Sequence, residues 1–355
     1  MLEILLDRFG DGAVLVMAGA LVGLVFGTMA QQSRFCLRAA TVEVADGQLG
    51  PRLYIWLIAF GAAVFSVQSM VALGWLDVSE ARQIAATGSL SGAIIGGLLF
   101  GCGMILARGC VSRLLVLSAT GNLRAIVTGL VVTLAAQASL RGALAPTREA
   151  LSSLWVVEGG PDRSILATLG MSSGVAAGLS ALALCAALLL ARRKQVRLLR
   201  AFAAVGVGVA VGLGWVLTHA IAQTSFEVVP VASITFTGPS TDTLMGLVNS
   251  TELPLGFGVG LVPGVVIGAG LAALLTREAR IERFGPDTPM ERYLIGAVLM
   301  GFGSMLAGGC AVGAGMSGGA IFALTAWVAV FAMWVGAMAT HILLSKVRSG
   351  RQAMV

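Results

Sequence analysis

The chain has 355 residues, of which 57% are hydrophobic and only 11% are charged, and its formal net charge is +6. Its mean hydropathy is +0.93, whereas soluble domains are about 45–50% apolar and about 25% charged. The composition therefore excludes a soluble enzyme, a disordered chain and a nucleic-acid-binding protein. It predicts a protein that is embedded in a lipid bilayer.

Nine charge-poor stretches are long enough to cross a bilayer as helices, each of which needs about 20 apolar residues. The first stretch is interpreted as a retained span, because the start of the chain lacks the positive region and the cleavage site of a signal peptide. We therefore expect an all-α integral membrane protein with about nine transmembrane helices. In chain order, these helices are expected over residues 13–30, 53–73, 90–107, 124–140, 165–191, 201–223, 255–276, 293–307 and 320–345.

Lys and Arg residues divide unequally between the two sides of this topology. If the C-terminus is cytoplasmic, 18 of the 23 basic residues fall in inner segments. Because cytoplasmic loops are enriched in Lys and Arg, we expect the N-terminus outside and the C-terminus inside a bacterial inner (plasma) membrane. The basic charge is thus a topology signal and indicates no nucleic-acid partner. The basic residues left outside are Arg8, Arg82, Arg141, Arg148 and Arg163.

Two segments of the chain resemble each other. Nine of 16 positions are identical between residues 95–110 and 295–310, and both segments end in Gly-Cys. Helix packing alone can also repeat small residues, but the shared Gly-Cys ending favours a true repeat. We expect two four-helix repeats, 1–145 and 201–355, joined by a connecting segment, 146–200, with one helix. That single helix inverts the second repeat, as in transporters that bind their solute at the repeat interface.

Four apolar segments are too short to cross the membrane and too apolar for ordinary loops. Non-helical backbone at membrane depth is tolerated only where it is buried in protein or lines a cavity. We therefore expect short re-entrant helices, two in each repeat, that meet near the middle of the membrane. The segments are residues 31–46, 109–120, 233–248 and 308–319.

Three of the five cysteines lie at these helix breaks. Cys36, Cys110 and Cys310 each stand beside Gly, Ser or Arg, whereas Cys185 is mid-helix and Cys102 has no counterpart in the second repeat. The chain contains no Cys-x-x-Cys motif and no histidine cluster, so neither a metal site nor a thioredoxin-like motif is predicted. We expect no metal and no cofactor.

The motifs Gln-Gln-Ser-Arg-Phe-Cys at 31–36, Leu-Ala-Arg-Gly-Cys at 106–110 and Ala-Gly-Gly-Cys at 307–310 resemble the three cysteine motifs of YeeE/YedE proteins. The resemblance covers nearly the whole chain. It implies a transporter of reduced sulfur compounds, with thiosulfate as the characterised substrate class and the three motif cysteines on its pathway. It also implies a small cytoplasmic sulfur-carrier partner of the TusA type. Some members of the family are linked to selenium metabolism, so a related selenium or sulfur compound is an alternative substrate.

The residues themselves suit a sulfur dianion. Stripping water from such an anion is costly without partners, and helix N-termini supply free amides and a positive dipole end. Gly109 and Gly309 let the backbone approach the anion, and neutral thiols add weak donors. Weak binding at several sites favours passage over trapping.

Three polar residues near the inner breaks are further candidates for the pathway: Ser33, Arg34 and Arg108. The two arginines either attract the anion toward the cytoplasmic exit or only mark the inner side. Gly308 matches Arg108 in the repeat, so we expect the outer vestibule to lack that charge.

Other functions remain open at this point. A membrane thiol or sulfurtransferase enzyme would hold sulfur covalently as a cysteine persulfide. A structural subunit would dock a soluble protein on its basic inner face, but the paired Gly-Cys breaks argue against this role. No phosphate-binding loop is present, so we expect facilitated passage drawn by consumption of the anion inside. His219 and His341 are the ionisable candidates within the spans, and both are expected to be structural.

Overall fold

The computed structural model describes residues 2–249, 255–284 and 290–352. Within these ranges, nine helices are long and apolar enough to cross a membrane. The expected all-α class and the nine spans are therefore confirmed. The long helices of these spans are α2 (Asp11–Ser33), α4 (Pro51–Ala72), α6 (Leu90–Leu106), α8 (Leu123–Arg141), α11 (Ser173–Arg193), α12 (Leu198–Thr224), α14 (Phe257–Leu275), α15 (Met290–Leu306) and α16 (Leu324–Gln352). The spans that begin with α2, α6 and α15 continue through the next short helix, to Ala45, Ala119 and Gly318.

Shorter elements connect these helices. The described chain has one small sheet, in which β1 (Gly88–Ser89) pairs antiparallel with β2 (Val156–Val157). The short helices are α1 (Leu2–Phe9), α3 (Leu37–Ala45), α5 (Arg82–Ala85), α7 (Val111–Ala119), α9 (Ala145–Ser152), the 3-10 helix η1 (Pro161–Arg163), α10 (Ile165–Thr168), α13 (Thr237–Asn249) and the π-helix η2 (Ala311–Gly318). Helices α3, α7, α13 and η2 occupy the four segments that the sequence marks as too short to span.

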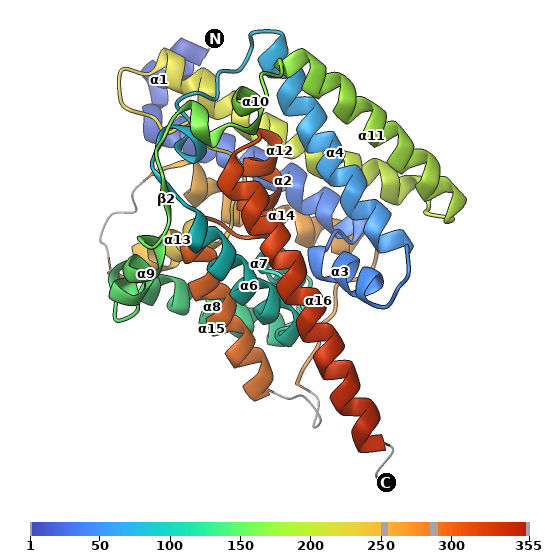
Figure 1. Ribbon diagram of the computed structural model, residues 1–355. Helices are drawn as coiled ribbons and strands as arrows, with labels where there is room; N and C mark the ends of the chain where they lie inside the picture. Colours follow the sequence, from blue (N-terminus) through green and yellow to red (C-terminus); the bar gives the residue numbers. More distant parts are fainter. Residues whose placement is uncertain (1, 250–254, 285–289, 353–355) are drawn as a thin grey trace.

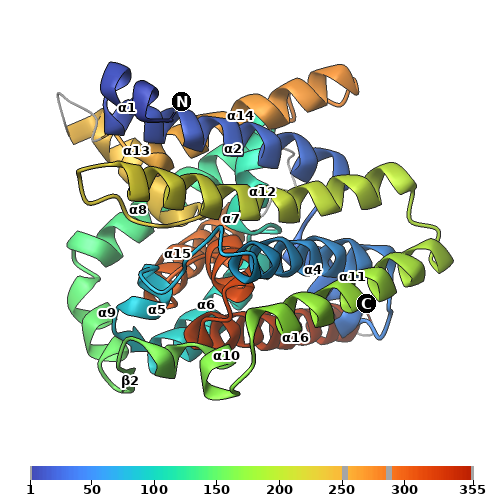
Figure 2. The same ribbon diagram turned by 90° about the horizontal axis from the view of Figure 1, so that it is seen from above.

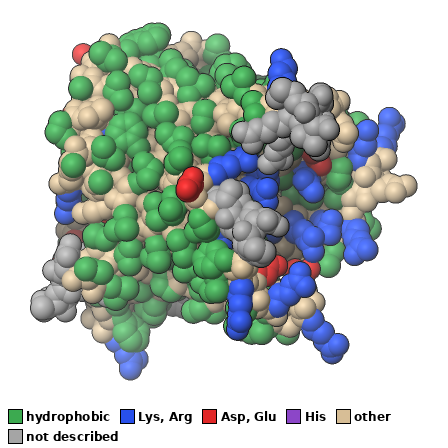
Figure 3. Space-filling model, turned by 90° about the horizontal axis from the view of Figure 1, so that it is seen from below, with side chains coloured by type: hydrophobic (Ala, Val, Ile, Leu, Met, Phe, Trp, Pro, Cys, Tyr) green, Lys and Arg blue, Asp and Glu red, His purple; other side chains and the backbone are tan. Residues whose placement is uncertain are grey.

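The long helices lie side by side in one bundle (Figures 1 and 2). The largest contacts join α2 to α14, α16 to α6, and α15 to α6. Seen from below, apolar side chains cover most of the surface, and Lys and Arg side chains gather toward one side (Figure 3). This distribution is what a bilayer imposes on a protein with one basic end.

Helices α6 and α15 cross through glycines. A Cβ atom built on Gly96 would lie 2.5 Å from the carbonyl oxygen of Gly303, and one built on Gly103 would lie 2.6 Å from that of Gly296. Small residues allow such close backbone approach in membranes. The repeated glycines of residues 95–110 and 295–310 therefore meet one another.

The short helices also pack in a regular pattern. Helix α3 contacts α4 and α16, whereas α13 contacts α14 and α8. Helix α7 packs against α8, and η2 packs against α16. Each of these four short helices thus packs against long helices, and η2 is buried along its whole length.

The single helix expected over 165–191 is wrong in its first part. The chain forms α10, turns at Gly170 with φ of +63°, and starts α11 only at Ser173. Glycine adopts this left-handed conformation without the Cβ penalty. Ser172 then caps α11, because its hydroxyl accepts a hydrogen bond from the N–H of Val175 at 3.4 Å. The expected second repeat, 201–355, includes residues 250–254, 285–289 and 353–355, which lie outside the described residues.

Candidate functional site

Three cysteines begin short helices directly after breaks in the bundle. Cys36 is the N-cap of α3, Cys110 of α7 and Cys310 of η2, and each has an extended backbone. The preceding helices are α2, α6 and α15. The structure thus places all three cysteines at the helix breaks that the sequence predicts.

Each break is made in the same way. Two residues before each cysteine stands a left-handed residue: Arg34 with φ of 55°, Arg108 with φ of 56° and Gly308 with φ of 78°. A left-handed residue is a common helix terminator, and it reverses the chain within a few residues. Arginine pays a Cβ penalty in this conformation that glycine avoids. The pattern of a left-handed residue, one spacer and a cysteine is therefore one structural device used three times.

The spacers Gly109 and Gly309 differ in how strictly they are needed. A Cβ atom on Gly309 would lie 2.8 Å from the backbone N of Ala314, so only glycine lets η2 fold back this closely. At Gly109 the nearest atom would be a side-chain carbon of Leu114 at 3.4 Å, an ordinary contact. The two predicted glycines are thus not equivalent.

The breaks expose helix N-termini. The first intrahelical bond of α7 runs from the N–H of Leu114 to the oxygen of Cys110 at 2.9 Å, and that of η2 from the N–H of Ala314 to Cys310 at 2.8 Å. The amides between these residues lack the usual i−4 carbonyl acceptor, and two of them turn to the cysteines instead: Gly313 N–H donates to the sulfur of Cys310 at 3.5 Å, and Arg113 N–H donates to the sulfur of Cys110. Such amides attract anions.

The cysteines lie in the core of the bundle. Cys110 and Cys310 are each 1% exposed, and Cys36 is half-buried. The side chains of Cys36 and Cys110 are neighbours, and the sulfur of Cys110 lies 3.3 Å from the hydroxyl of Ser112. Helices α7 and η2 contact each other. The structure therefore pairs the first two cysteines and places the third on a neighbouring element.

The remaining two cysteines lie away from the breaks. Cys185 is exposed on α11. Cys102 donates weakly to the carbonyl oxygen of Gly336 at 3.6 Å.

Ser33 and Arg34 are both engaged at the end of α2. The hydroxyl of Ser33 donates to the carbonyl oxygen of Met29 at 2.7 Å and accepts from the N–H of Phe35 at 3.3 Å. The guanidinium of Arg34 forms an ion pair with Glu278 at 3.0 Å, and its side chain is 55% exposed. Ser33 therefore holds the break, whereas Arg34 faces the surface.

Arg108 lies beside an aromatic ring. Its guanidinium carbon is 6.0 Å from the ring centre of Tyr293, and that of Arg124 is 4.8 Å from the same ring. The guanidinium groups of Arg108 and Arg124 therefore contact the same ring, that of Tyr293, on the side expected to be cytoplasmic. Cation–π contacts of this kind contribute modestly at exposed sites, so the guanidinium of Arg108 is positioned but not neutralised by this ring.

Sequence reasoning missed a polar cavity near Arg34. It measures about 340 Å³. The amide nitrogen of Gln31 donates to Glu278 at 2.9 Å, whereas the amide oxygen of Gln31 and the Nη1 of Arg113 are buried without a hydrogen-bond partner among the described residues. Its lining is Gln31, Arg34, Arg113, Leu117, Thr120, Arg277, Glu278, Arg280 and Glu282.

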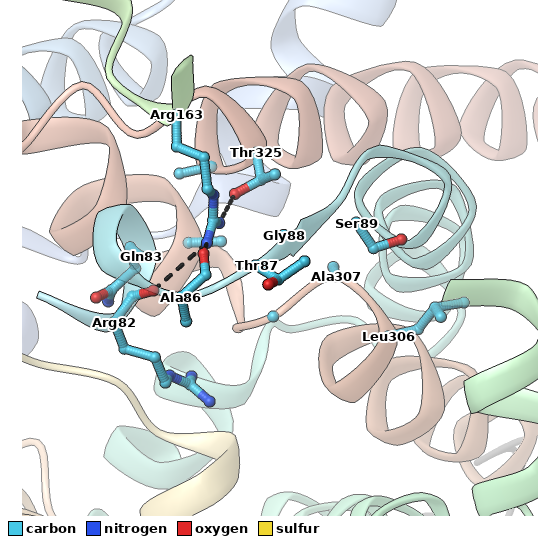
Figure 4. A pocket seen from close by; sticks show the side chains of 13 residues that line it. Arg82, Gln83, Ala86, Thr87, Gly88, Ser89, Arg163, Leu306, Ala307 and Thr325 are labelled. Carbon is cyan, nitrogen blue, oxygen red and sulfur yellow. Dashed lines mark hydrogen bonds between the residues drawn. The ribbon is translucent and has the colours of Figure 1, made fainter. Parts of the chain in front are cut away.

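A second polar cavity, of about 230 Å³, is lined in part by Gly308 of the break before Cys310 (Figure 4). Arg163 lines this cavity, and its Nη2 donates to the hydroxyl of Thr325 at 2.6 Å. Sequence reasoning placed Arg163 outside the membrane but gave it no role. We call this space the Arg163 cavity. Its lining is Arg82, Gln83, Ala86, Thr87, Gly88, Ser89, Arg163, Leu306, Ala307, Gly308, Ala314, Thr325 and Ala326.

The two histidines bond to loop residues at helix ends. The Nε2 of His219 accepts from the backbone N–H of Asp77 at 3.3 Å, and the Nε2 of His341 lies 2.8 Å from a carboxylate oxygen of Asp46. Hydrogen bonds from Ser79 hold the pKa of Asp77 below its usual value. These contacts tie loops to α12 and α16.

In the described part of the chain, nine helices are long and apolar enough to cross a membrane, and three of them end at cysteine-bearing breaks with polar cavities nearby. These features define a multi-pass membrane protein of the transporter class. The chain belongs to the sulphur-transport family, whose family model matches residues 32–339. The resemblance inferred from the cysteine motifs is thereby confirmed.

Two curated relatives are similar along nearly the whole chain. The thiosulfate transporter TsuA of Spirochaeta thermophila is 28% identical over 338 residues, which cover 89% of this chain and 94% of that protein. The thiosulfate transporter TsuA of Escherichia coli is 24% identical over 345 residues, which cover 91% and 92% respectively.

Proposed function

We propose that this protein carries thiosulfate, or a closely related sulfur anion, through the bacterial inner membrane into the cytoplasm. One observation carries the proposal: three cysteines stand at the N-cap positions of short helices, two of them fully buried, in a chain of the sulphur-transport family. Cys310, Cys110 and Cys36 serve in this order as resting points. The names of the two curated relatives point to the same substrate.

The chemistry of these breaks fits a soft dianion. Removing water from two negative charges is costly unless donors replace it, and helix N-termini provide amides together with a positive dipole end. A neutral thiol is a weak donor that suits the terminal sulfur of thiosulfate. Because each contact is weak, the anion moves on instead of being trapped.

We further propose that residues 1–145 and 201–355 form two inverted repeats joined by residues 146–200. The contacts between helices support this arrangement, because they keep the same pattern when each element of the first repeat is replaced by its counterpart in the second. In order, α2, α3, α4, α6, α7 and α8 correspond to α12, α13, α14, α15, η2 and α16. Under the exchange, the contact of α3 with α16 becomes that of α13 with α8, and the contact of α7 with α8 becomes that of η2 with α16. The glycine pairs between α6 and α15 also exchange with each other. Short helices at such an interface are suited to alternating access.

The orientation that we propose has the N-terminus outside and the C-terminus in the cytoplasm. The basic residues gathered at one side (Figure 3) then lie in the cytoplasm, as the positive-inside rule requires. Arg34 and Arg108 stand at this exit. A small TusA-like sulfur carrier is the partner that would take up the anion or its sulfur there.

The decisive experiment is uptake of radiolabelled thiosulfate into liposomes that contain only this protein. Cys110→Ala and Cys310→Ala are expected to lower the rate at least about tenfold, which raises the barrier to passage by about 1.4 kcal/mol or more. Cys185→Ala is the matched control, because that thiol is exposed on α11, and it is expected to leave uptake unchanged. Wild-type vesicles that take up no thiosulfate, or cysteine variants that match the wild type, would refute the proposal.

The proximity of Cys36 and Cys110 supports one other function, a sulfurtransferase. A thiolate of this pair would attack the outer sulfur of thiosulfate, form a persulfide anion and release sulfite. Mass spectrometry during turnover separates the two functions. A persulfide on either cysteine, together with complete loss of activity in Cys→Ser variants, favours the enzyme, whereas transport without a persulfide favours the permease.

A further inference from the structure

Helices α11 and α12 leave an apolar groove between them on the surface of the bundle. Both helices pack on α4 and make little contact with each other, and Figure 2 shows α4 between them. The groove encloses about 650 Å³, which is more than the Arg163 cavity or the polar cavity near Arg34. Its described lining residues are all apolar except Arg192. We call this space the α11–α12 groove.

The groove faces the surrounding bilayer. Its walls include Leu189, Leu198 and Phe202, whose exposed fractions are 62%, 67% and 69%, whereas Ala201 lies deeper and is 8% exposed. Helix α11 lies at the edge of the bundle (Figure 1) and is the least buried of the nine described spans. Apolar walls offer water too few hydrogen-bond partners to hold it. An acyl chain of a lipid is therefore the occupant that suits this space in a membrane.

One end of the groove is strongly basic. The turn from α11 to α12 carries five cations within nine residues, namely Arg192, Arg193, Lys194, Arg197 and Arg200. None of them forms an ion pair with an acidic residue in the described part of the chain. In the proposed orientation, this turn lies on the cytoplasmic side, where the membrane surface contains anionic lipids.

The absence of acidic residues distinguishes this turn from another basic segment on the same proposed side, residues 277–283. There, Arg280 pairs with Glu282, and Glu278 pairs with Arg34. By contrast, the sequence has no Asp or Glu anywhere between residues 163 and 226. The positive-inside rule accounts for cations at both segments, but it does not account for an apolar groove that ends at the unpaired ones. A ligand with an anionic head and an apolar tail complements both features.

The turn that carries these charges is ordered. Gln195 adopts a left-handed conformation with φ of 56°, and the N–H of Val196 donates to the carbonyl oxygen of Ala191 at 3.0 Å. The side chains of Val196 and Ala191 are buried and line the groove. The cations therefore lie on a fixed turn directly at the end of the groove.

We propose that the α11–α12 groove binds an anionic glycerophospholipid of the cytoplasmic leaflet, with an acyl chain between the two helices and the phosphate beside Arg192 and Arg197. Guanidinium groups recognise phosphate oxygens through parallel N–H donors, and basic pockets between membrane helices bind anionic head groups. The bound lipid joins the connecting helix α11 to α12, which otherwise contact each other little. The site is separate from the cysteines and does not depend on the identity of the transported anion.

The test measures lipid binding to the purified full-length protein by native mass spectrometry. Phosphatidylglycerol and phosphatidylcholine with identical palmitoyl and oleoyl chains are titrated separately, so that only the head group differs. We expect phosphatidylglycerol to bind about tenfold more tightly or better, because each nearby cation favours the anionic lipid. Glycerol phosphate, which has the charge but no acyl chain, is expected not to displace it.

Charge variants test the basic end of the groove. Arg192→Gln combined with Arg197→Gln is expected to lower the affinity for phosphatidylglycerol about tenfold and to leave that for phosphatidylcholine unchanged. Arg192→Lys combined with Arg197→Lys is expected to keep most of the preference, since the charges remain. Arg283→Gln combined with Lys346→Gln is the matched control, because it removes two exposed charges from the same proposed side, away from the groove.

A bulky side chain tests the apolar part of the groove. Leu189→Trp is expected to weaken the binding of both lipids about threefold or more, because the indole takes space from the acyl chain and so reduces its apolar burial. Leu190→Trp is the matched control, since Leu190 is the next residue on α11, is 43% exposed and does not line the groove.

Each outcome decides for or against the lipid site. A preference for phosphatidylglycerol that is lost in the double Gln variant and kept in its control supports the inference. Equal affinity for the two lipids, displacement by glycerol phosphate, or Leu189→Trp protein that binds like the wild type overturns it, and so does a dimer that covers the groove and binds no lipid. Thermal unfolding identifies a misfolded variant, and the comparison of the two lipids on the wild-type protein still decides in that case. None of these results depends on thiosulfate uptake, so a failure here leaves the proposed function intact.

Discussion

Arg108 and Gly308 both have left-handed backbone two residues before a cysteine, but one carries a long charged side chain and the other carries none. Gly308 has φ of 78° and no atom would crowd a Cβ there, so any cost of a side chain comes from the backbone alone. Arg108 accepts the same conformation at φ of 56°. Left-handed backbone costs an L-residue about 1 kcal/mol or slightly more. The chain evidently keeps an arginine at one break in spite of that cost.

A reciprocal pair of substitutions tests this cost. Gly308→Ala is expected to lower the free energy of unfolding by about 1 kcal/mol, because alanine is strained in the left-handed region. Arg108→Gly is expected to leave stability unchanged or to raise it by up to about 1 kcal/mol, partly offset by the greater freedom of glycine in the unfolded chain. Thermal unfolding in detergent measures both. Equal destabilisation by the two changes would contradict this account.

The positions of the cysteines could be predicted from sequence, whereas their surroundings could not. A Gly-Cys ending repeated 200 residues apart marks two of the breaks, and a glycine or polar residue beside each cysteine explains why a helix stops there. The ion pair of Arg34 joins residues 244 positions apart, and Arg163 meets Thr325 across 162 positions. No local pattern encodes such pairings, because they follow from the packing of whole helices.

At the scale of an element, η2 is held by its neighbours more than by itself. Its sequence, Ala-Val-Gly-Ala-Gly-Met-Ser-Gly, is rich in glycine, which disfavours helix. Ser317 donates to the carbonyl oxygen of Ile234 at 2.6 Å. The amide of Gln68, on α4, donates to the carbonyl oxygen of Ala320 at 2.6 Å, just after η2. These buried bonds fix the element that carries Cys310.

Gln68→Leu is therefore expected to destabilise the protein by about 1–3 kcal/mol, because the carbonyl group of Ala320 loses its buried donor. Uptake of thiosulfate should fall as well, since the end of η2 is released. Gln223→Leu, at an exposed position on α12, is the control and should change stability by less than about 0.5 kcal/mol. Unfolding and uptake are measured on the same preparations. A Gln68→Leu protein as stable as the control would contradict the role given to this bond.

The crossing of α6 and α15 gives a second prediction for elements. Gly96→Ala would place a methyl group 2.5 Å from backbone atoms of α15, so the helices must separate, at a cost of about 1–3 kcal/mol. Gly129→Ala, in α8, meets no atom within 4 Å and should stabilise by about 0.5–1 kcal/mol, because alanine favours helix over glycine. The melting temperatures of the two variants should therefore move in opposite directions. A stabilised Gly96→Ala protein would show that the crossing is not close-packed.

At the scale of the whole molecule, hydropathy predicts the spans because a bilayer demands long apolar helices. It does not predict which helices pack, since lipid and helix surfaces are equally apolar. The connecting helix shows a further limit. Its apolar composition continues through 165–172, yet Gly170 turns the chain there. One left-handed glycine sets where α11 starts, and an average of hydropathy over many residues cannot predict such a turn.

Accessibility of engineered cysteines tests the orientation of the molecule, on which the order of the resting points and the outer place of the Arg163 cavity depend. In a Cys185→Ala background, Glu158→Cys lies in an exposed loop on the proposed outer side, and Gln195→Cys in the exposed loop between α11 and α12. A membrane-impermeant maleimide applied to intact cells should label Glu158→Cys and spare Gln195→Cys until the membrane is opened.

The physical reason is the excess of basic residues on the inner side, 18 of 23, which opposes translocation of those loops. The same background without an added cysteine gives the baseline, because Cys110 and Cys310 are buried and any labelling of the half-buried Cys36 and Cys102 is measured there. Labelling of Gln195→Cys alone in intact cells would reverse the topology, and the Arg163 cavity would then face the exit of the pathway.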